Sequence, residues 1–198
     1  MPVAYLNGQY LAVEEACISP LDRGFLFGDA VYEVIPVFGD KALLLDAHLS
    51  RLARSLEQLA IANPMDAREW AAVIEQLVQR NGGGDLGIYL QVTRGADRGR
   101  DHLPPAGIPP TVFGMASPAP APSSAVTAIT LPDTRWGRCD IKATALLANI
   151  LARQQAAEAG ADEAILVWDG MVTEGSSSSV LIVERGRLVR RPNGQDIL

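Results

Sequence analysis

The sequence predicts a two-domain α+β protein, and three observations lead to this fold class. Stretches of alternating apolar and polar residues, typical of strands, occur in both halves of the chain. Two consecutive amphipathic segments in the first half have the spacing of helices. Between the halves, the alternating prolines of SPAPAPSS are typical of an extended linker. We therefore expect an N-terminal α+β domain at 1–118, a Pro-rich linker at 119–123 and a C-terminal domain at 124–198.

Local signals in the first half predict hairpins and capped helices. Asn7-Gly8 and Gly39-Asp40 are dipeptides that adopt positive φ angles, so each predicts a tight hairpin turn. Apolar residues then recur every three or four positions after Asp46, which we expect to cap a helix. Asp66 opens a second such segment with Glu69 three residues later, which is the pattern of a capping box.

Further elements follow the same rules along the rest of the chain. A long polar, Pro-rich loop joins two strands of the first half, and loops of this length are often functional. A helix rich in small and apolar residues is expected to be buried. The expected elements are strands at 86–93 and 111–116, a strand at 125–131, a helix from about Ala143 to Glu158, a strand at 163–169, a turn at Asp169-Gly170, and two strands around Gly175 and Gly186.

Composition excludes several classes of function. The 198 residues carry a formal net charge of −6, which argues against binding nucleic acid or an anionic membrane surface. No window is apolar enough for a membrane span, and the first residues lack the pattern of a signal peptide. Cys17 and Cys139 have no metal-type spacing and form no disulfide framework. We expect a cytoplasmic protein without a bound metal.

Lys142 is the first candidate for chemistry. Only two of the 17 cationic residues are lysines, Lys41 and Lys142, and Lys41 falls in a turn where solvation explains it. Lys142 opens a predicted helix, where the helix dipole disfavours a cation. Burial among apolar residues lowers the pKa of an ammonium group and yields an amine that can attack a carbonyl. The alternative is a solvated lysine near a helix start.

Glu174 is the second candidate, because it precedes a glycine and four serines. A carboxylate can keep a ring nitrogen protonated, and the following amides and hydroxyls suit an anion. The alternative is a polar loop between strands. Lys142 and Glu174 support each other, since pyridoxal phosphate needs an amine for its aldehyde, an acid for its pyridine nitrogen and donors for its phosphate.

A family resemblance rests on segments that cover nearly the whole chain. They resemble the fold-type IV pyridoxal-phosphate enzymes, and most closely the bacterial D-amino acid aminotransferases. The segments are YLNGQY, SPLDRGFLFGDAVYEVIPV, AHLSRLARSLEQL and RWGRCDIKATALLANILARQQAAEAGADEAILVWDGMVTEGSSSSV.

The resemblance implies roles for residues around the cofactor, pyridoxal 5′-phosphate. Lys142 matches the Schiff-base lysine, which also moves the proton between the substrate Cα and the cofactor C4′. Glu174 matches the acid that pairs with the pyridine nitrogen, and Arg51 matches the arginine that binds the phosphate. Ser176 and Ser177, in EGSSS, match further cofactor-binding positions.

The resemblance also implies a substrate site and a homodimer. Tyr32 matches a tyrosine that lines the substrate site. Arg100 and His102 match a pair that reaches across a dimer interface to bind the substrate carboxylate. The implied reaction transfers an amino group from a D-amino acid to a 2-oxo acid such as pyruvate or 2-oxoglutarate, in a ping-pong cycle.

Two departures from the family pattern affect the expected site. Ser179 stands where the family usually has asparagine. Family chains are longer, so we expect an incomplete second domain that lacks a turn whose amides hold the phosphate. Leu198 resembles a leucine that packs on the cofactor ring.

Three alternatives stay open at this point. The same scaffold supports branched-chain L-amino acid aminotransferases and aminodeoxychorismate lyases, because a fold does not fix the substrate. The pair Arg100 and His102 favours the D-amino acid activity. An inactive truncated fragment is the third alternative.

Overall fold

The structure is a computed structural model that describes residues 1–121 and 123–198, and the chain divides into two compact units. The first unit consists of Met1–Pro120 and Ile141–Ala145, and the second of Ala121–Asp140 and Leu146–Leu198. The segment Ile141–Ala145, which the sequence places in the second domain, thus packs with the first unit. The linker expected at 119–123 includes residue 122, which lies outside the described residues.

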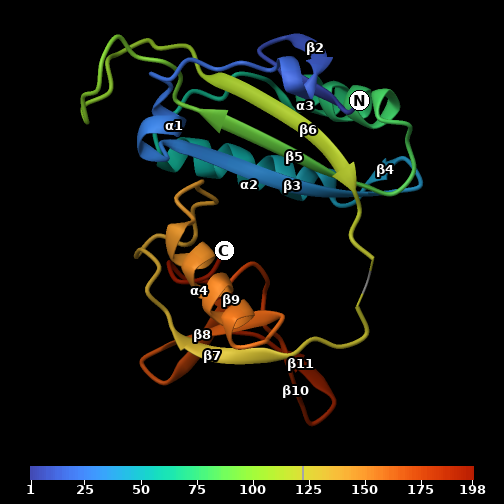
Figure 1. The fold of residues 1–198 in the computed structure, drawn as a ribbon, viewed down its shortest axis with the longest axis vertical. Coiled ribbons are helices and arrows are strands. Elements are labelled where there is room, and N and C mark those ends of the chain that lie inside the picture. Colours follow the sequence, from blue (N-terminus) through green and yellow to red (C-terminus); the bar gives the residue numbers. More distant parts are fainter. Residues whose placement is uncertain (122) are drawn as a thin grey trace. The chain divides into compact units, whose positions relative to one another are not determined.

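The first unit is built around an antiparallel sheet (Figure 1). Within the described residues, its strand order is β2-β1-β6-β5-β3-β4. Both predicted hairpin turns are confirmed, because Asn7 and Gly8 have φ of 46° and 93°, and Gly39 and Asp40 have φ of 53° and 68°. The strands are β1 (Val3–Leu6), β2 (Gln9–Ala12), β3 (Ala30–Phe38), β4 (Lys41–Ala42), β5 (Leu86–Thr93) and β6 (Thr111–Pro118).

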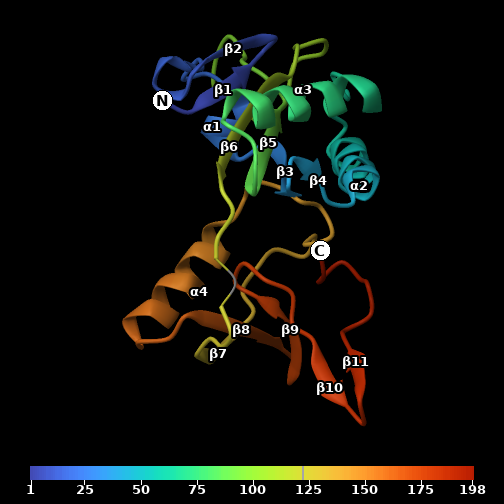
Figure 2. The ribbon, with the colours of Figure 1, turned by 90° about the vertical axis from the view of Figure 1, so that its right-hand side faces the viewer.

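Two longer helices, α2 (Leu45–Gln58) and α3 (Ala67–Arg80), cover one face of this sheet (Figure 2). The capping box of α3 is confirmed, since the Asp66 side chain accepts from the backbone of Glu69 and the Glu69 side chain from that of Asp66. The cap expected at Asp46 is wrong: α2 begins one residue earlier, after Leu44, and Asp46 lies in its first turn. Two short helices precede them, η1 (Val13–Glu15) and α1 (Arg23–Phe27).

The core of the first unit lies between this helical layer and the sheet. Alternate residues of β3 and β5 point toward the helices, as the two-residue period of a strand requires. The other residues of these strands lie on the opposite face, which carries Tyr32 and Tyr89. The most deeply buried core side chains are Val31, Ile35, Val37, Leu52, Leu56, Trp70, Leu77, Ile88, Leu90 and Val92.

The second unit contains a small mixed sheet and a separate hairpin (Figure 2). In the sheet order β7-β8-β9, β7 and β8 run parallel and α4 connects them, while β9 is antiparallel to β8. Helix α4 packs on the sheet through Ala152 and Ala156, beside Ala164 and Leu166. The elements are β7 (Ala128–Pro132), α4 (Leu147–Glu158), β8 (Glu163–Trp168), β9 (Met171–Gly175), β10 (Ile182–Glu184) and β11 (Arg187–Val189).

The helix expected from about Ala143 begins later, at Leu147. The residues before it pair with β3 instead, because Ala143 forms an antiparallel bridge with Val31 and the amide of Thr144 donates to the carbonyl of Ala30. This pairing depends on a strand more than 100 residues away, so local helix signals could not show it. The expectation of a buried helix is also wrong, since Leu147 is 69% exposed.

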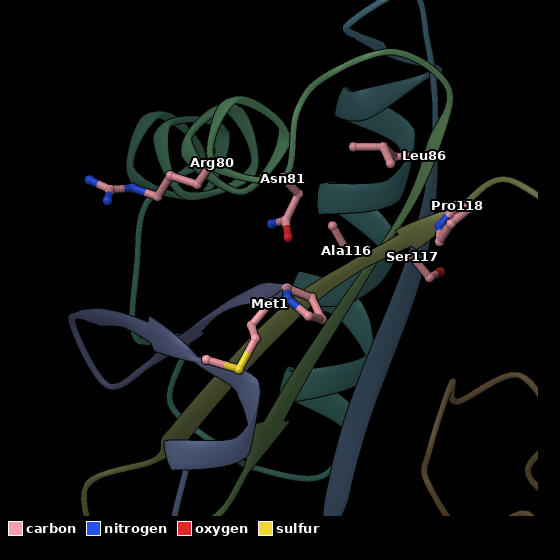
Figure 3. A pocket seen from close by; sticks show the side chains of 8 residues that line it. Met1, Arg80, Asn81, Leu86, Ala116, Ser117 and Pro118 are labelled. Carbon is pink, nitrogen blue, oxygen red and sulfur yellow. The ribbon is translucent and has the colours of Figure 1, made fainter.

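A pocket of about 420 Å³ opens beside the end of α3 (Figure 3). The side chain of Asn81 lines it, but this amide already bonds the backbone N–H and C=O of Val3 and the carbonyl of Leu77. The residues expected to bind cofactor or substrate do not line this pocket. Asn81 therefore connects β1 to α3.

In the described part of the chain, no helix combines the length and apolarity that crossing a membrane requires.

Candidate active site

Lys142 lies on the extended segment that pairs with β3. Its neighbours Ile141 and Ala143 are buried in the core of the first unit. Because extended residues alternate in direction, the side chain of Lys142 points the other way. Its Nζ lies 4.4 Å from the centroid of the Tyr32 ring, and its backbone N–H donates to Ser55 Oγ at 3.3 Å. The fold thus places the candidate amine beside the candidate substrate tyrosine.

Arg51 lies one helical turn before Ser55, so both residues occupy the same face of α2. Its Nε donates to Oε1 of Glu33 at 2.6 Å, and its Nη2 donates to Oε2 at 2.8 Å. His48 Nδ1 lies 2.8 Å from the same Oε2. Glu33 is completely buried, whereas the Arg51 side chain is 27% exposed. Glu33 therefore orients a guanidinium group that still reaches solvent.

Sequence reasoning missed Glu33, although a signal was present. In β3 the residues Val31, Ile35 and Val37 face the core, and Glu33 lies in the same series of every second residue. A charged residue at a core-facing position requires a buried partner. The strand pattern therefore predicts a paired carboxylate at this position.

The face of the sheet that carries Tyr32 is lined by aromatic rings. Tyr32 stacks on Tyr89 with centroids 5.7 Å apart, and Tyr89 contacts Phe113 at 6.5 Å. The hydroxyl of Tyr89 donates to Oε1 of Gln91 at 2.7 Å. Burial, with a smaller contribution from Tyr32, raises the pKa of Tyr89 to about 12. This face is therefore a neutral, mainly apolar wall beside Lys142.

Arg100 and His102 lie on the long loop between β5 and β6, and both are exposed. The Arg100 guanidinium group stands 5.1 Å from the centroid of the Phe27 ring, and the His102 ring lies 5.4 Å from the same ring. The loop thus holds the two side chains around one aromatic ring at the end of α1.

Glu174 is buried in the second unit and accepts hydrogen bonds on both oxygens. Arg135 Nη1 donates to Oε2 at 2.6 Å, and the backbone N–H of Leu198 donates to Oε1 at 3.2 Å. Arg135 also binds Asp133, with Nη2 to Oδ2 at 2.8 Å. A carboxylate has about four lone-pair positions, so Glu174 can accept one more donor. No periodic pattern in the sequence indicates Arg135, which follows a strand in an irregular segment.

The serines after Glu174 gather around another carboxylate, Glu163. The hydroxyls of Ser176, Ser177 and Ser178 all donate to it, at 3.3 Å from Ser177 and 2.9 Å from Ser178. Burial alone would raise the pKa of Glu163, but the bonds from Ser176, the amide of Ala164 and Ser178 outweigh it and hold the pKa at about 2. Glu163 therefore shapes the serine turn, which sequence reasoning did not foresee.

The structure groups the candidate residues within each unit. In the first unit Lys142 lies beside Tyr32. Its backbone N–H also bonds Ser55, which is on the same face of α2 as Arg51. In the second unit Glu174 lies next to Leu198, with Ser176 one residue beyond the end of β9. Ser179 is exposed at the end of the turn.

These donor groups fit pyridoxal phosphate. An amine suits the aldehyde, a guanidinium fork suits the phosphate, and a buried carboxylate that can accept a further bond suits a protonated ring nitrogen. The hydroxyls of Ser176 and Ser177 are engaged by Glu163. Each unit therefore carries side chains of the kinds that this cofactor requires.

Comparison with known proteins gives the family. The profile described as amino-transferase class IV matches residues 30–198. The D-alanine aminotransferase of Bacillus licheniformis is 40% identical over 190 residues, covering 94% of this chain and 67% of the relative. That of Staphylococcus epidermidis is 34% identical over 202 residues, covering 100% and 72%. The chain belongs to the class IV aminotransferase family, whose members transfer amino groups with pyridoxal phosphate.

Solved structures show the same fold. A branched-chain aminotransferase from Thermoproteus uzoniensis with norvaline aligns with a TM-score of 0.85 at 28% identity, over 99% of this chain and 70% of that one. A hypothetical aminotransferase from Mycobacterium tuberculosis, in its PLP-bound form, aligns with a TM-score of 0.86 at 26% identity, over 98% and 72%. The expected fold class is confirmed.

Proposed function

We propose that this aminotransferase acts on D-amino acids, with a 2-oxo acid such as pyruvate or 2-oxoglutarate as acceptor. The observation that carries the proposal is the exposed pair on the β5–β6 loop, Arg100 and His102, whose N–H groups suit the carboxylate of an α-amino acid. Similarity to the D-alanine aminotransferases supports it.

Each candidate residue has a role in this proposal. Lys142 holds the cofactor through its amine, Arg51 binds the phosphate and Glu174 pairs with the ring nitrogen. Leu198 packs on the ring, and its backbone bond to Glu174 supports a position near that nitrogen. Ser176 and Ser177 contribute to the phosphate side through the turn that Glu163 shapes.

The chemistry divides between cofactor and protein. When bound, pyridoxal phosphate supplies an electron sink for the charge that develops at the substrate Cα. The Nζ amine of Lys142 removes the proton from Cα, while Arg100 and His102 hold the carboxylate and fix which face of Cα meets the amine. Tyr32 and its aromatic neighbours exclude water from the Lys142 side.

Assembly and location belong to the same proposal. Arg100 and His102 act at the site of a partner subunit, so the working form is a homodimer. The free thiols of Cys17 and Cys139 suit a reducing compartment, and we place the enzyme in the cytoplasm.

A branched-chain L-amino acid aminotransferase is the second candidate. Its supporting observation is the structural match to the Thermoproteus uzoniensis enzyme, but that identity is 28%, against 40% for the Bacillus licheniformis D-alanine enzyme. An aminodeoxychorismate lyase on this scaffold would release pyruvate without an amino acceptor.

The test compares enantiomers with the cofactor-loaded protein. With 2-oxoglutarate as acceptor we expect glutamate to form when D-alanine is the donor, with release of pyruvate, and no glutamate to form when L-valine or L-alanine is the donor. Replacing Arg100 with alanine should raise KM for D-alanine by about 10- to 100-fold, because a charge-assisted hydrogen bond is lost. Arg98→Ala, in the same exposed loop, is the matched control with an unchanged KM. Preference for an L-amino acid, or turnover of neither enantiomer, would overturn the proposal.

A further inference from the structure

Arg23 is a buried arginine whose side chain reaches the loop of Arg100 and His102. It is 3% exposed, although it lies at the start of a short surface helix, α1. Its Nη1 donates to the backbone carbonyl of Asp101 at 2.6 Å, and its Nη2 donates to that of His102 at 2.9 Å. No local sequence pattern indicates this contact.

The two carbonyls bound by Arg23 lie on either side of the His102 Cα. The Asp101 carbonyl belongs to the peptide unit before that atom, and the His102 carbonyl to the unit after it. Fixing both units limits rotation about φ and ψ of His102, and the planar guanidinium fork can hold both at once. Arg23 therefore sets the direction in which the side chain of His102 leaves the backbone.

Arg23 is itself held firmly. Its Nε donates to Oδ2 of Asp29 at 3.0 Å, and Asp29 also accepts from Arg94. The preceding residue, Asp22, caps α1 and accepts from the hydroxyls of Thr93 at 2.9 Å and Thr111 at 2.7 Å. These threonines end β5 and begin β6, so the fork is anchored to the sheet.

The ring of Phe27 links Arg23 to the exposed side chains. The Arg23 guanidinium group lies 4.8 Å from its centroid, and that of Arg100 lies 5.1 Å from it. His102 contacts the same ring. One aromatic ring thus supports both exposed side chains, while the buried arginine holds the backbone carbonyls of Asp101 and His102.

We propose that Arg23 is a positioning residue that sets the presentation of Arg100 and His102 to the substrate carboxylate. This inference rests on the proposed carboxylate-binding role of that pair. Arg23 is buried and acts through its hydrogen bonds to the backbone of the loop, without touching the substrate.

Arg94 provides a matched control. It donates to the same carboxylate, with Nε to Asp29 Oδ2 at 2.7 Å, but its Nη1 and Nη2 bind the carbonyls of Ala60 and Leu59 near the end of α2. Arg23→Lys and Arg94→Lys therefore each weaken an ion pair with the same partly buried carboxylate, Asp29, and only the first releases the loop.

The kinetic test uses the cofactor-loaded enzyme with D-alanine. We expect Arg23→Lys to raise KM about ten-fold with kcat changed less than about three-fold, because misplaced binding groups weaken carboxylate capture. Arg94→Lys should leave KM unchanged. In an Arg100→Ala background, Arg23→Lys should add less than about two-fold, because residues that act through one another are not additive.

A proteolytic test needs neither substrate nor cofactor. Trypsin can cut after Arg98 and after Arg100, which are both exposed. In the wild-type protein we expect the ratio of cleavage after Arg100 to cleavage after Arg98 to be at least about ten-fold lower than in the same chain unfolded in urea, because Arg23 fixes the backbone there. Arg23→Lys should remove this difference without speeding cleavage after Arg80, at the end of α3.

The outcomes separate the two proposals. If Arg100→Ala raises KM and Arg23→Lys does not, the positioning role is overturned and the carboxylate role stands. An unchanged KM in Arg100→Ala overturns the carboxylate role, and the positioning role falls with it. A wild-type cleavage ratio equal to that of the unfolded chain overturns the positioning role even if Arg23→Lys does not fold.

Discussion

Glu33 and Arg51 form a two-pronged ion pair in which Nε and Nη2 of the arginine meet the two carboxylate oxygens at 2.6 and 2.8 Å. The carboxylate side of the pair is fully buried and the guanidinium side reaches solvent. The fold thus uses a core position of β3 to orient the arginine that we assign to the cofactor phosphate.

Replacing Glu33 with glutamine should destabilise the protein strongly. The substitution removes the counter-charge of the Arg51 guanidinium group and weakens charge-assisted hydrogen bonds, at a cost of about 1.5–3 kcal/mol. Urea unfolding measures this loss, and titration with pyridoxal phosphate should show weaker binding. Asp140→Asn is the control, because the pair of Asp140 with Arg138 is about one-third exposed and should change stability by less than about 1 kcal/mol. Similar losses in both variants would refute the orienting role of Glu33.

Gly95 should be essential to the geometry of the substrate loop. Its φ is +103°, and a Cβ atom there would lie 2.1 Å from the carbonyl oxygen of Pro109, at the other end of the loop. Gly95→Ala should therefore open the base of the loop and raise KM for D-alanine by about ten-fold or more. Gly99 lies in the same loop with open space around it, so Gly99→Ala should leave KM unchanged. Equal KM values in the two variants would contradict this account of the loop.

Glu163 should make the stability of the protein sensitive to acid. Its pKa is lowered from 4.5 to about 2 in the folded chain, so the carboxylate stabilises the fold above about pH 4.5. That contribution is lost as the pH falls from about 4.5 toward 2. Glu163→Gln should cost about 2 kcal/mol at pH 7, with the difference from wild type shrinking across this window.

The measurement is urea unfolding at several pH values. Glu158→Gln serves as control, because Glu158 is an exposed glutamate on α4 in the same unit. A difference between wild type and Glu163→Gln that stays constant from pH 7 to pH 2 would refute the assigned role.

Local chemistry made part of the fold predictable. The turns at Asn7-Gly8 and Gly39-Asp40 and the capping box of Asp66 depend on neighbouring residues alone, and all three are confirmed. The start of α4 was not predictable in this way, because the pairing of residues 143 and 144 with β3 keeps the chain extended.

The candidate site was predictable to a similar degree. Local chemistry indicated Lys142 and Glu174, and the resemblance added Arg51, but their buried partners carry no motif. Arg135 and Arg23 act through contacts between segments distant in the sequence, and only the folded chain shows these contacts. Glu33 is the exception, because every second residue of β3 faces the core and Glu33 is one of them, which predicts a buried carboxylate.

The central claim is that Lys142 holds the cofactor, and the chain suits a direct test because it contains only one other lysine, Lys41. The protein is loaded with pyridoxal phosphate, reduced with borohydride, digested with trypsin and analysed by mass spectrometry. A modified lysine resists trypsin, so we predict the phosphopyridoxyl group on an uncut peptide of residues 139–153. A label on Lys41, or no label on either lysine, would contradict the assignment.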